Sequence, residues 1–373
     1  MPRVGPNLIA LAIPFFFLGI GIELWAARRR GVAVYRLADS LADLGCGIGQ
    51  QMVSALIATS AVTASYDWVA GHRLLTLPGT VLPWVVAFFG LEFAYYWWHR
   101  LSHEVNFLWA AHVVHHQSED YNLAVALRQS VTTWLTTLPF YLPLALLGVP
   151  TTHFLVMLGI STLYQFWIHT ELVPPLGWFE RVFNTPALHR VHHAINPGYL
   201  DRNHGAMVSF WDELFGTYQR ETEPCVFGTT RPIDSFNPLW AQVETFVDLW
   251  RLARRAPSFV DAVRVFVGSP AWRPTWMGDA LKRDFSRKYE RPASRKVCRY
   301  ALSQWVIVVL VVFAFILWGG ELSWVSRVAV SGFVVHTLAT IPALLEAKSW
   351  AKPLEAVRLV SVPALVTLLL AFG

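Results

Sequence analysis

Long apolar runs recur along the chain and are separated by shorter polar stretches. These runs lie at about 7–27, 48–66, 79–98, 130–148, 151–168, 301–318, 324–345 and 354–372. A helix of about 20 apolar residues crosses the roughly 30 Å apolar core of a bilayer, so the pattern predicts membrane helices. The two runs that flank Val149 and Pro150 predict either two full spans or one hairpin that dips into the bilayer.

The spacing of the apolar runs also suggests how the chain is divided. We expect N-terminal membrane helices over 1–78, a catalytic core over 79–225, a cytosolic connecting segment over 226–300 and C-terminal membrane helices over 301–373. The sequence therefore predicts an all-α fold, a polytopic membrane helical bundle whose cytosolic cap is rich in histidine and holds two metal ions.

Composition and charge support an integral membrane protein. Hydrophobic residues make up 54% of the chain and the mean hydropathy is +0.41, more apolar than a soluble domain requires. Arg28, Arg29 and Arg30 follow the first run, and the positive-inside rule places that loop in the cytoplasm. Counting the predicted spans from there puts 99–129 and 169–300 on the same side. Cytoplasmic loops explain the net charge of +5, so no nucleic-acid partner is expected.

Histidine is concentrated in three short clusters, each just outside an apolar run. Eight of the 13 histidines belong to them, and five of these fall within the 18 residues from 99 to 116. Residues three or four positions apart share one face of a helix, so each cluster predicts imidazoles that point the same way. The clusters have the patterns H-x₃-H, H-x₂-H-H and H-x₂-H-H: His99 and His103; His112, His115 and His116; His189, His192 and His193.

A shared metal centre explains these clusters better than separate capping or interfacial histidines do. Neutral imidazole binds a metal through one nitrogen, while its other nitrogen donates a hydrogen bond to a second acceptor. Nearby carboxylates are expected to be these acceptors: Glu92, Glu104, Glu119, Asp120, Asp201 and Asp212. His169 ends an apolar run at the depth predicted for His99, and we expect it to be a ninth ligand. His204 is expected to contact a ligand or the substrate instead of the metal.

Eight imidazoles are too many for one ion and suit two. Imidazole binds zinc, copper, nickel and iron alike. Zinc sites usually have three or four ligands, and the H-E-x-x-H motif of zinc hydrolases is absent from the sequence. The E-x-x-H motif of carboxylate-bound di-iron bundles is absent too. A pair of redox-active iron ions is therefore favoured, and a membrane zinc hydrolase and a metal transporter are the alternatives from other classes.

The clusters and their flanks resemble a known family. Three such clusters after membrane runs look like the fatty acid hydroxylase/sterol desaturase superfamily, and the flanks at 112–123, 166–171, 196–203 and 211–217 are similar to its alkylglycerol monooxygenase branch. The resemblance implies two iron ions, O₂, and electrons from tetrahydrobiopterin or from a cytochrome- or ferredoxin-type protein. It implies that the following residues are catalytic and bind iron, with His169 as a further ligand: His99, His103, His112, His115, His116, His189, His192 and His193.

The same resemblance implies the reaction. A di-iron monooxygenase of this branch hydroxylates a lipid C–H bond beside an ether oxygen, and the product collapses to an aldehyde and glycerol. Sterol or fatty-acyl hydroxylation or desaturation is the alternative, because histidine spacing does not distinguish insertion of OH from removal of a second hydrogen. The expected partners are a membrane lipid and an electron donor, either a pterin or a protein. The expected location is a multi-pass membrane protein with its active site on the cytoplasmic side.

Overall fold

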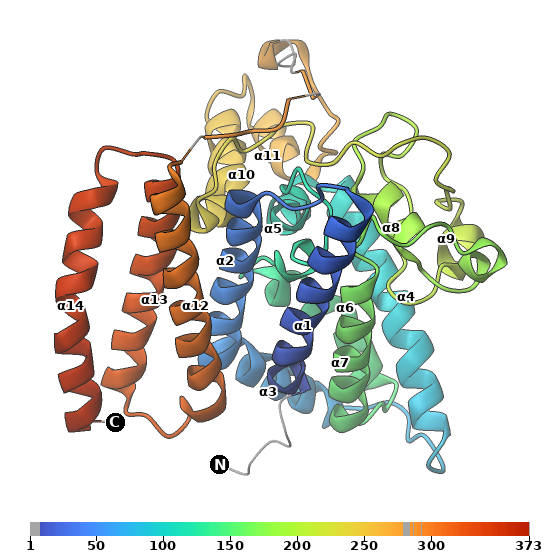
Figure 1. Cartoon of the computed structure of the whole chain (residues 1–373). Helices are drawn as coiled ribbons and strands as arrows, with labels where there is room; N and C mark the ends of the chain where they lie inside the picture. Colours follow the sequence, from blue (N-terminus) through green and yellow to red (C-terminus); the bar gives the residue numbers. More distant parts are fainter. Residues whose placement is uncertain (1–7, 279–283, 286, 292, 373) are drawn as a thin grey trace.

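The structure is a computed structural model that describes residues 8–278, 284, 285, 287–291 and 293–372. This part of the chain is helical and contains no strand, although two isolated β-bridges join Phe183 to Val208 and Ala194 to Phe227. Five of its helices are long and apolar enough to cross a bilayer: Leu11–Arg30, Leu37–Ala70, Arg295–Trp318, Trp324–Leu345 and Ala351–Ala371. The prediction of an all-α membrane bundle is confirmed (Figure 1).

The N-terminal region forms two long helices that run in opposite directions (Figure 1). The first, α1 (Leu8–Arg30), ends at three arginines, and α2 (Leu37–Val53) begins at the same end of the molecule. A π-helix, η1 (Ser54–Ala58), joins α2 to α3 (Thr59–Ala70) without a break, which gives one helix of 34 residues. The predicted span 48–66 is therefore only part of a longer helix.

Four helices follow in the chain: α4 (Leu82–Glu104), α5 (Asn106–His116), α6 (Thr133–Leu146) and α7 (Thr151–Trp167). With 14 and 17 residues, α6 and α7 are about 21 and 26 Å long, which is too short to cross a roughly 30 Å core. A short turn joins them and both pack against α3 and α4, so the structure favours the predicted hairpin over two full spans. The helix α4 is long enough, but buried Glu92 and its polar end Tyr95–Glu104 make it less apolar. The runs 79–98, 130–148 and 151–168 are thus not among the five candidate spans.

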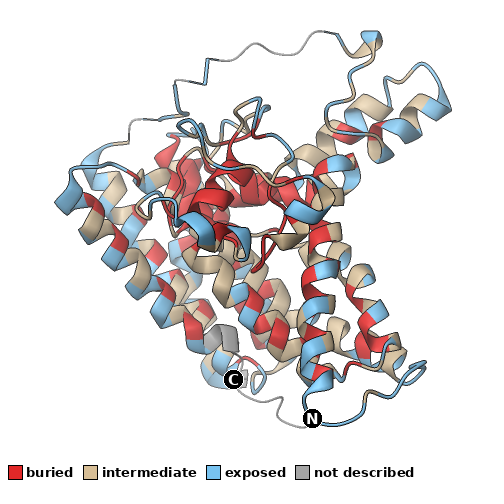
Figure 2. Ribbon diagram, turned by 90° about the vertical axis from the view of Figure 1, so that its right-hand side faces the viewer, coloured by how far each residue is buried: buried red, intermediate tan, exposed pale blue. Residues whose placement is uncertain are grey.

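The stretch 186–267 forms a cap at the end of the molecule where α1 ends and α2 begins (Figure 1). Its helices are α8 (Pro186–His193), α9 (Phe210–Phe215), α10 (Pro238–Ala253) and α11 (Phe259–Val267). The longest of them, α10, packs against α2 and α5, which ties the cap to the bundle. Figure 2 shows that buried residues gather in this layer, whereas the membrane helices below keep exposed faces.

The C-terminal helices form a separate group beside the bundle. They are α12 (Arg295–Trp318), α13 (Trp324–Leu345) and α14 (Ala351–Phe372). Both α12 and α13 pack on α2, and buried Trp305 and Leu338 belong to the apolar core at this contact. Within the group, Arg358 of α14 is buried and forms an ion pair with Glu355 at 2.6 Å.

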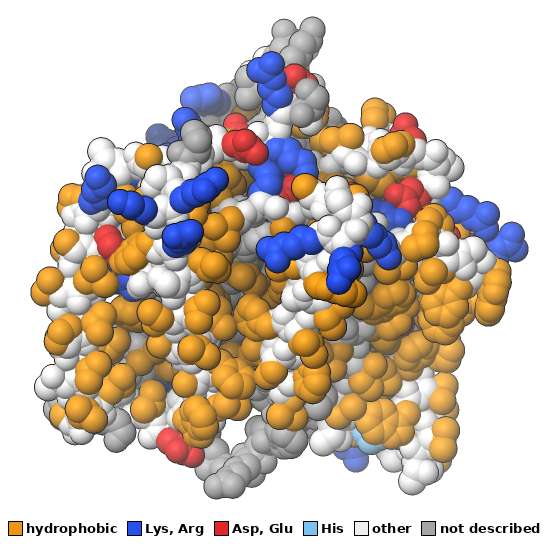
Figure 3. Space-filling model, in the orientation of Figure 1, with side chains coloured by type: hydrophobic (Ala, Val, Ile, Leu, Met, Phe, Trp, Pro, Cys, Tyr) orange, Lys and Arg blue, Asp and Glu red, His pale blue; other side chains and the backbone are white. Residues whose placement is uncertain are grey.

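The surface is divided into an apolar band and a basic band. Figure 3 shows hydrophobic side chains over the lower part of one face and Lys and Arg side chains across its upper part. Large apolar side chains on the outer helices are openly exposed, including Phe15 (69%), Val360 (77%) and Leu370 (84%). Water would make such exposure unfavourable by about 25 cal/mol per Å², so these faces fit a bilayer.

Close packing between α2 and the loop after α5 leads to a prediction for Gly47. A Cβ atom at Gly47 would lie 2.4 Å from the main-chain oxygen of Leu127, so Gly47→Ala requires the loop to move. Overpacking of this kind costs about 1–3 kcal/mol. We expect a lower midpoint of thermal unfolding for the detergent-solubilised protein, followed by tryptophan fluorescence.

Gly49→Ala is the matched control in the same helix. Its Cβ would meet only Val131 Cγ1 at 3.6 Å and Leu338 Cδ1 at 3.9 Å, which are ordinary contacts. Replacing a helical glycine by alanine without strain stabilises by about 0.5–1 kcal/mol. Equal effects of the two substitutions would show that the approach of Leu127 does not restrict position 47.

Candidate metal centre

Helices from separate parts of the chain supply the clustered histidines. His99 and His103 lie on the last two turns of α4, and the second cluster forms the end of α5. The third cluster forms the end of α8, a helix that begins at Pro186 and is capped by the side chain of Thr185, which accepts a hydrogen bond from the main-chain N–H of Leu188. His169 lies just beyond the end of α7.

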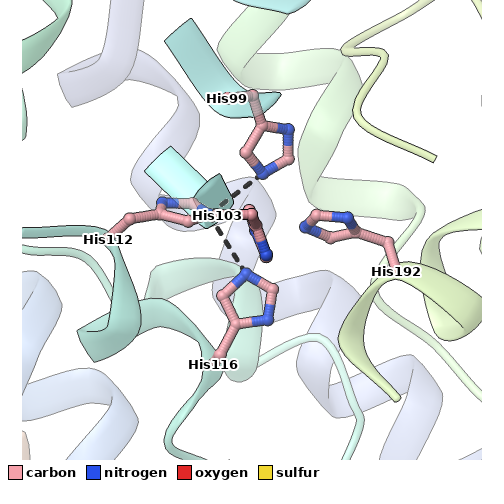
Figure 4. Close-up of side chains that lie close together, drawn as sticks. All are labelled: His99, His103, His112, His116 and His192. Atoms are coloured by element: carbon pink, nitrogen blue, oxygen red, sulfur yellow. Dashed lines mark hydrogen bonds between the residues drawn. The ribbon is translucent and has the colours of Figure 1, made fainter. Parts of the chain in front are cut away.

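The structure brings all nine predicted histidines together in two groups. Within each group, one nitrogen of every imidazole lies within 4.8 Å of the others. The first group, shown in Figure 4, is His99, His103, His112, His116 and His192. The second group is His115, His169, His189 and His193.

Helix geometry explains why the two H-x₂-H-H clusters are divided between the groups. In α5 the i and i+4 residues, His112 and His116, belong to the first group, and His115 belongs to the second. In α8 the division is reversed. The i and i+4 residues, His189 and His193, belong to the second group, and His192 belongs to the first. Each of these helices therefore contributes to both groups and fixes their separation.

In both groups, single Nε2 atoms lie within hydrogen-bond distance of two other Nε2 atoms. His112 Nε2 lies 3.0 Å from His99 Nε2 and 3.1 Å from His116 Nε2. In the second group, His169 Nε2 lies 3.1 Å from His115 Nε2 and 3.0 Å from His189 Nε2. One Nε2 carries either one proton or one lone pair, so it cannot form two good hydrogen bonds of this kind. This arrangement suits lone pairs that are directed at a shared cation.

The spacing also bears on the coordination geometry. Ligands at right angles around an ion, each about 2.1 Å from it, lie about 3.0 Å apart, whereas tetrahedral ligands lie about 3.4 Å apart. The distances of 3.0–3.2 Å within the two groups lie between these values and fit either arrangement. Five imidazoles in the first group also exceed the four ligands of a structural zinc site.

Main-chain carbonyl groups hold the opposite side of several rings. A carbonyl can only accept, so Nδ1 carries the proton and the lone pair of Nε2 is left for a metal. Four Nδ1 atoms donate in this way over 2.7–2.9 Å: His99 to His204, His115 to Arg128, His169 to Gln165 and His192 to Arg202.

The expectation that Glu92 and Asp212 would accept from the rings is wrong. Glu92 Oε2 accepts the main-chain N–H groups of Met207 and Val208 at 3.0 and 3.1 Å. Asp212 accepts those of His204 and Gly205 at 2.7 and 2.9 Å. These carboxylates fix the loop whose carbonyl orients His99, so they act on the main chain and not on an imidazole.

Burial keeps the imidazoles neutral. None of the nine is more than 8% exposed. Removal from water disfavours the charged form, and it lowers the pKa of His115 to about 4 and that of His192 to about 3. At pH 7 both rings are therefore unprotonated at Nε2. Nine neutral imidazoles in two compact groups fit a pair of metal ions.

His204 lies against the first group without belonging to it. Its ring centroid is 5.2 Å from that of His103 and 5.6 Å from that of His192, and the side chain is fully buried. Neither ring nitrogen forms a hydrogen bond. This placement agrees with the expectation that His204 contacts a ligand and is not one of the nine.

Comparisons with known proteins identify relatives over nearly the whole chain. A family model described as fatty acid hydroxylase matches residues 84–217. The alkylglycerol monooxygenase of Homo sapiens is 34% identical over 364 residues, which cover 95% of this chain and 81% of the relative. That of Danio rerio is also 34% identical, over 378 residues that cover 99% and 83%. An ornithine lipid hydroxylase of Rhizobium tropici is 31% identical over 145 residues, which cover 39% and 43%. No solved structure matches the chain.

The lowered histidine pKa values predict that acid destabilises the metal-free protein. An unfolded histidine has a pKa of about 6.5, whereas the folded values are about 4 for His115 and about 3 for His192. As the pH falls below about 6.5, the unfolded chain binds protons before the folded protein does. The free energy of unfolding therefore decreases until the pH reaches the folded-state pKa values. Thermal unfolding of the chelator-treated protein, measured from about pH 7 to about pH 4, should show this decrease.

A variant with His115→Gln and His192→Gln provides the comparison. Glutamine is neutral over this pH range, so the midpoint of unfolding should depend less on pH in the variant. The same dependence in both proteins would contradict the assignment of these two rings as buried neutral groups.

Proposed function

Because the chain belongs to the alkylglycerol monooxygenase family of fatty acid hydroxylases, we propose that it cleaves ether lipids of the alkylglycerol class by O₂-dependent hydroxylation of the C–H bond beside the ether oxygen. It is a lipid monooxygenase, and the proposal concerns its substrate and its metal. The observation that carries the proposal is the pair of buried histidine groups, which is suited to two metal ions.

We propose that both ions are iron. The first group would hold one ion through five imidazoles and the second group the other through four. The five imidazoles of the first group and the absence of H-E-x-x-H both disfavour a zinc hydrolase. Iron bound there supplies the redox chemistry by which O₂ is reduced and one oxygen atom is inserted into the lipid.

The protein's own part is to exclude water and to hold the rings in place. Trp98 stacks over His99 with ring centroids 5.8 Å apart, and Trp109 lies 5.0 Å from His103. These indoles lie against the first group; Trp98 is 4% exposed, whereas Trp109 is only partly buried. A dry, rigid site of this kind protects the reaction from water and limits side reactions.

The position of the centre suits a lipid with a polar end. His103 is one residue from the end of α4, and the histidine-bearing ends of α4 and α5 meet beneath the cap (Figure 1). On the face shown in Figure 3, the basic band lies at this end of the molecule. We propose that the basic end faces the cytoplasm, as the positive-inside rule requires, and that the lipid headgroup stays near water while its ether bond reaches the metals.

The electron donor is part of the proposal. Insertion of one oxygen atom from O₂ requires two electrons and two protons, which leave as water with the second oxygen atom. By resemblance to its family, we propose tetrahydrobiopterin as the donor, with a cytochrome- or ferredoxin-type protein as the alternative. The donor would approach from the cytoplasmic side, where the cap is exposed.

Product analysis tests the reaction. The purified protein, supplied with iron, tetrahydrobiopterin, O₂ and an alkylglycerol, should release a fatty aldehyde that mass spectrometry detects, and removal of O₂ should abolish it. A panel containing a sterol, a fatty-acyl lipid and an ornithine lipid is run beside it. Turnover of one of these, with none of the alkylglycerol, would support the alternative sterol or fatty-acyl hydroxylase or desaturase. Aldehyde release without O₂ would exclude a monooxygenase.

Iron content tests the ligands. His103→Ala in the first group and His193→Ala in the second should each abolish turnover and lower the iron per chain, because each removes one imidazole from an ion. Elemental analysis with Mössbauer spectroscopy measures both the number of irons and their coupling. His336→Gln is the control, since His336 bonds the Leu354 carbonyl in the C-terminal helices and touches neither group. Full activity in both alanine variants would refute the assignment.

A further inference from the structure

Arg128 connects the second histidine group to the membrane helix α2. Its main-chain oxygen accepts the Nδ1–H of His115 over 2.9 Å. Its guanidinium group donates to the Val114 carbonyl at 2.6 Å, to Gln117 Oε1 at 3.0 Å and to Asp43 Oδ1 at 3.1 Å. Arg128 thus contacts the ring of His115 and residues on both sides of that histidine, Val114 and Gln117.

Among the described residues, Asp43 is the only one that forms an ion pair with the Arg128 guanidinium group. It lies on α2, outside the region 84–217 that matches the family model, and its side chain is completely buried. The side chain of Arg128 is only 2% exposed. The second carboxylate oxygen of Asp43 forms no hydrogen bond, so the contact with Arg128 is what holds the charge there.

A pair buried so deeply is poorly explained by stability alone. Removing two charges from water costs several kcal/mol per ion, and an apolar pair of similar volume often gives an equally stable protein. A buried pair is better suited to fix one conformation, and here the fixed atom is the carbonyl that orients a metal-binding ring. Loss of such an acceptor weakens metal binding by about 10–100-fold in metalloproteins generally.

We propose that Asp43 and Arg128 are positioning residues for the second metal ion and act through His115. Without the carboxylate, the guanidinium group loses its charged partner and moves, and the carbonyl of the same residue moves with it. The Nδ1–H of His115 then has no fixed acceptor, so the lone pair of Nε2 is no longer directed at the ion. The inference rests on the proposed two-metal centre.

The effect should be specific to the second ion. Its group has four imidazoles, so misplacing one removes a quarter of the protein ligands, whereas the first group has five. The rings of His99 and His192 in the first group take their acceptors from His204 and Arg202, on a different loop. Nothing in the contacts of Asp43 reaches that loop.

The test uses full-length protein in detergent with Asp43→Asn, which removes the charge and preserves the shape. Iron is added to the apoprotein and the bound metal is measured by elemental analysis, with Mössbauer spectra to report coupling. We expect the variant to bind the second iron about 10–100-fold more weakly, so that the count falls from two towards one and the coupled spectrum becomes that of isolated iron. Arg128→Lys keeps a positive charge but loses the planar set of donors, so it should also bind the second iron more weakly.

Glu355→Gln is the matched control. Glu355 forms a buried ion pair with Arg358 in the C-terminal helices, and the substitution makes the same change from carboxylate to amide. It should leave both irons bound and coupled. Thermal unfolding and size-exclusion profiles of the same samples identify any variant that has simply lost its fold.

Each outcome has a distinct meaning. Two coupled irons in both the Asp43 and Arg128 variants would overturn the inference. Loss of both irons from folded Asp43→Asn protein would overturn it too, because the effect would not be confined to the second ion. If the unaltered protein binds fewer than two irons, the proposed two-metal function fails instead, which separates the two failures.

Discussion

The structure depends on holding nine unprotonated imidazoles together away from water. Seven of their Nε2 atoms come within 3.0–3.2 Å of another Nε2 atom. Where both rings donate Nδ1–H to a carbonyl, as His115 and His169 do, the two lone pairs repel unless a cation lies between them. Burial keeps the rings neutral, and carbonyl groups on their far side fix which nitrogen carries the proton. Both conditions require a closed layer of protein around the site, and that layer is the buried cap seen in Figure 2.

Helical periodicity turns this requirement into a sequence pattern. An i, i+4 pair places two rings in one histidine group, and a third histidine beside that pair is rotated by about 100° and reaches the other group. His112 and His116 on α5 illustrate the pair, and His115 illustrates the additional ring. The clusters could therefore be assigned to one centre from the sequence alone, and His169 could be added because it ends an apolar run. The division of the two H-x₂-H-H clusters between the two histidine groups required the structure.

Features that depend on the main chain had no signal in the sequence. The carbonyl of Arg202 orients His192, and it lies between Asp201 and Asn203, which both have positive φ angles of 56° and 55°. Any residue has a carbonyl, so no side-chain pattern marks it as an acceptor. The same limit applies to the spans: hydropathy located the apolar runs, but the lengths of α6 and α7 depend on where the turn at 147–150 ends each helix.

The N-terminal helices contribute to the site as well as to membrane attachment. Glu23 on α1 is buried, accepts the main-chain N–H of Leu123 at 2.8 Å and bonds the hydroxyl of Thr170, the neighbour of His169. A carboxylate within an apolar helix is costly unless it has such partners. The buried pair of α14, in contrast, bonds only within the C-terminal helices. Acids on α1 and α2 thus hold loops beside the clustered histidines, which ties these two helices to the candidate site.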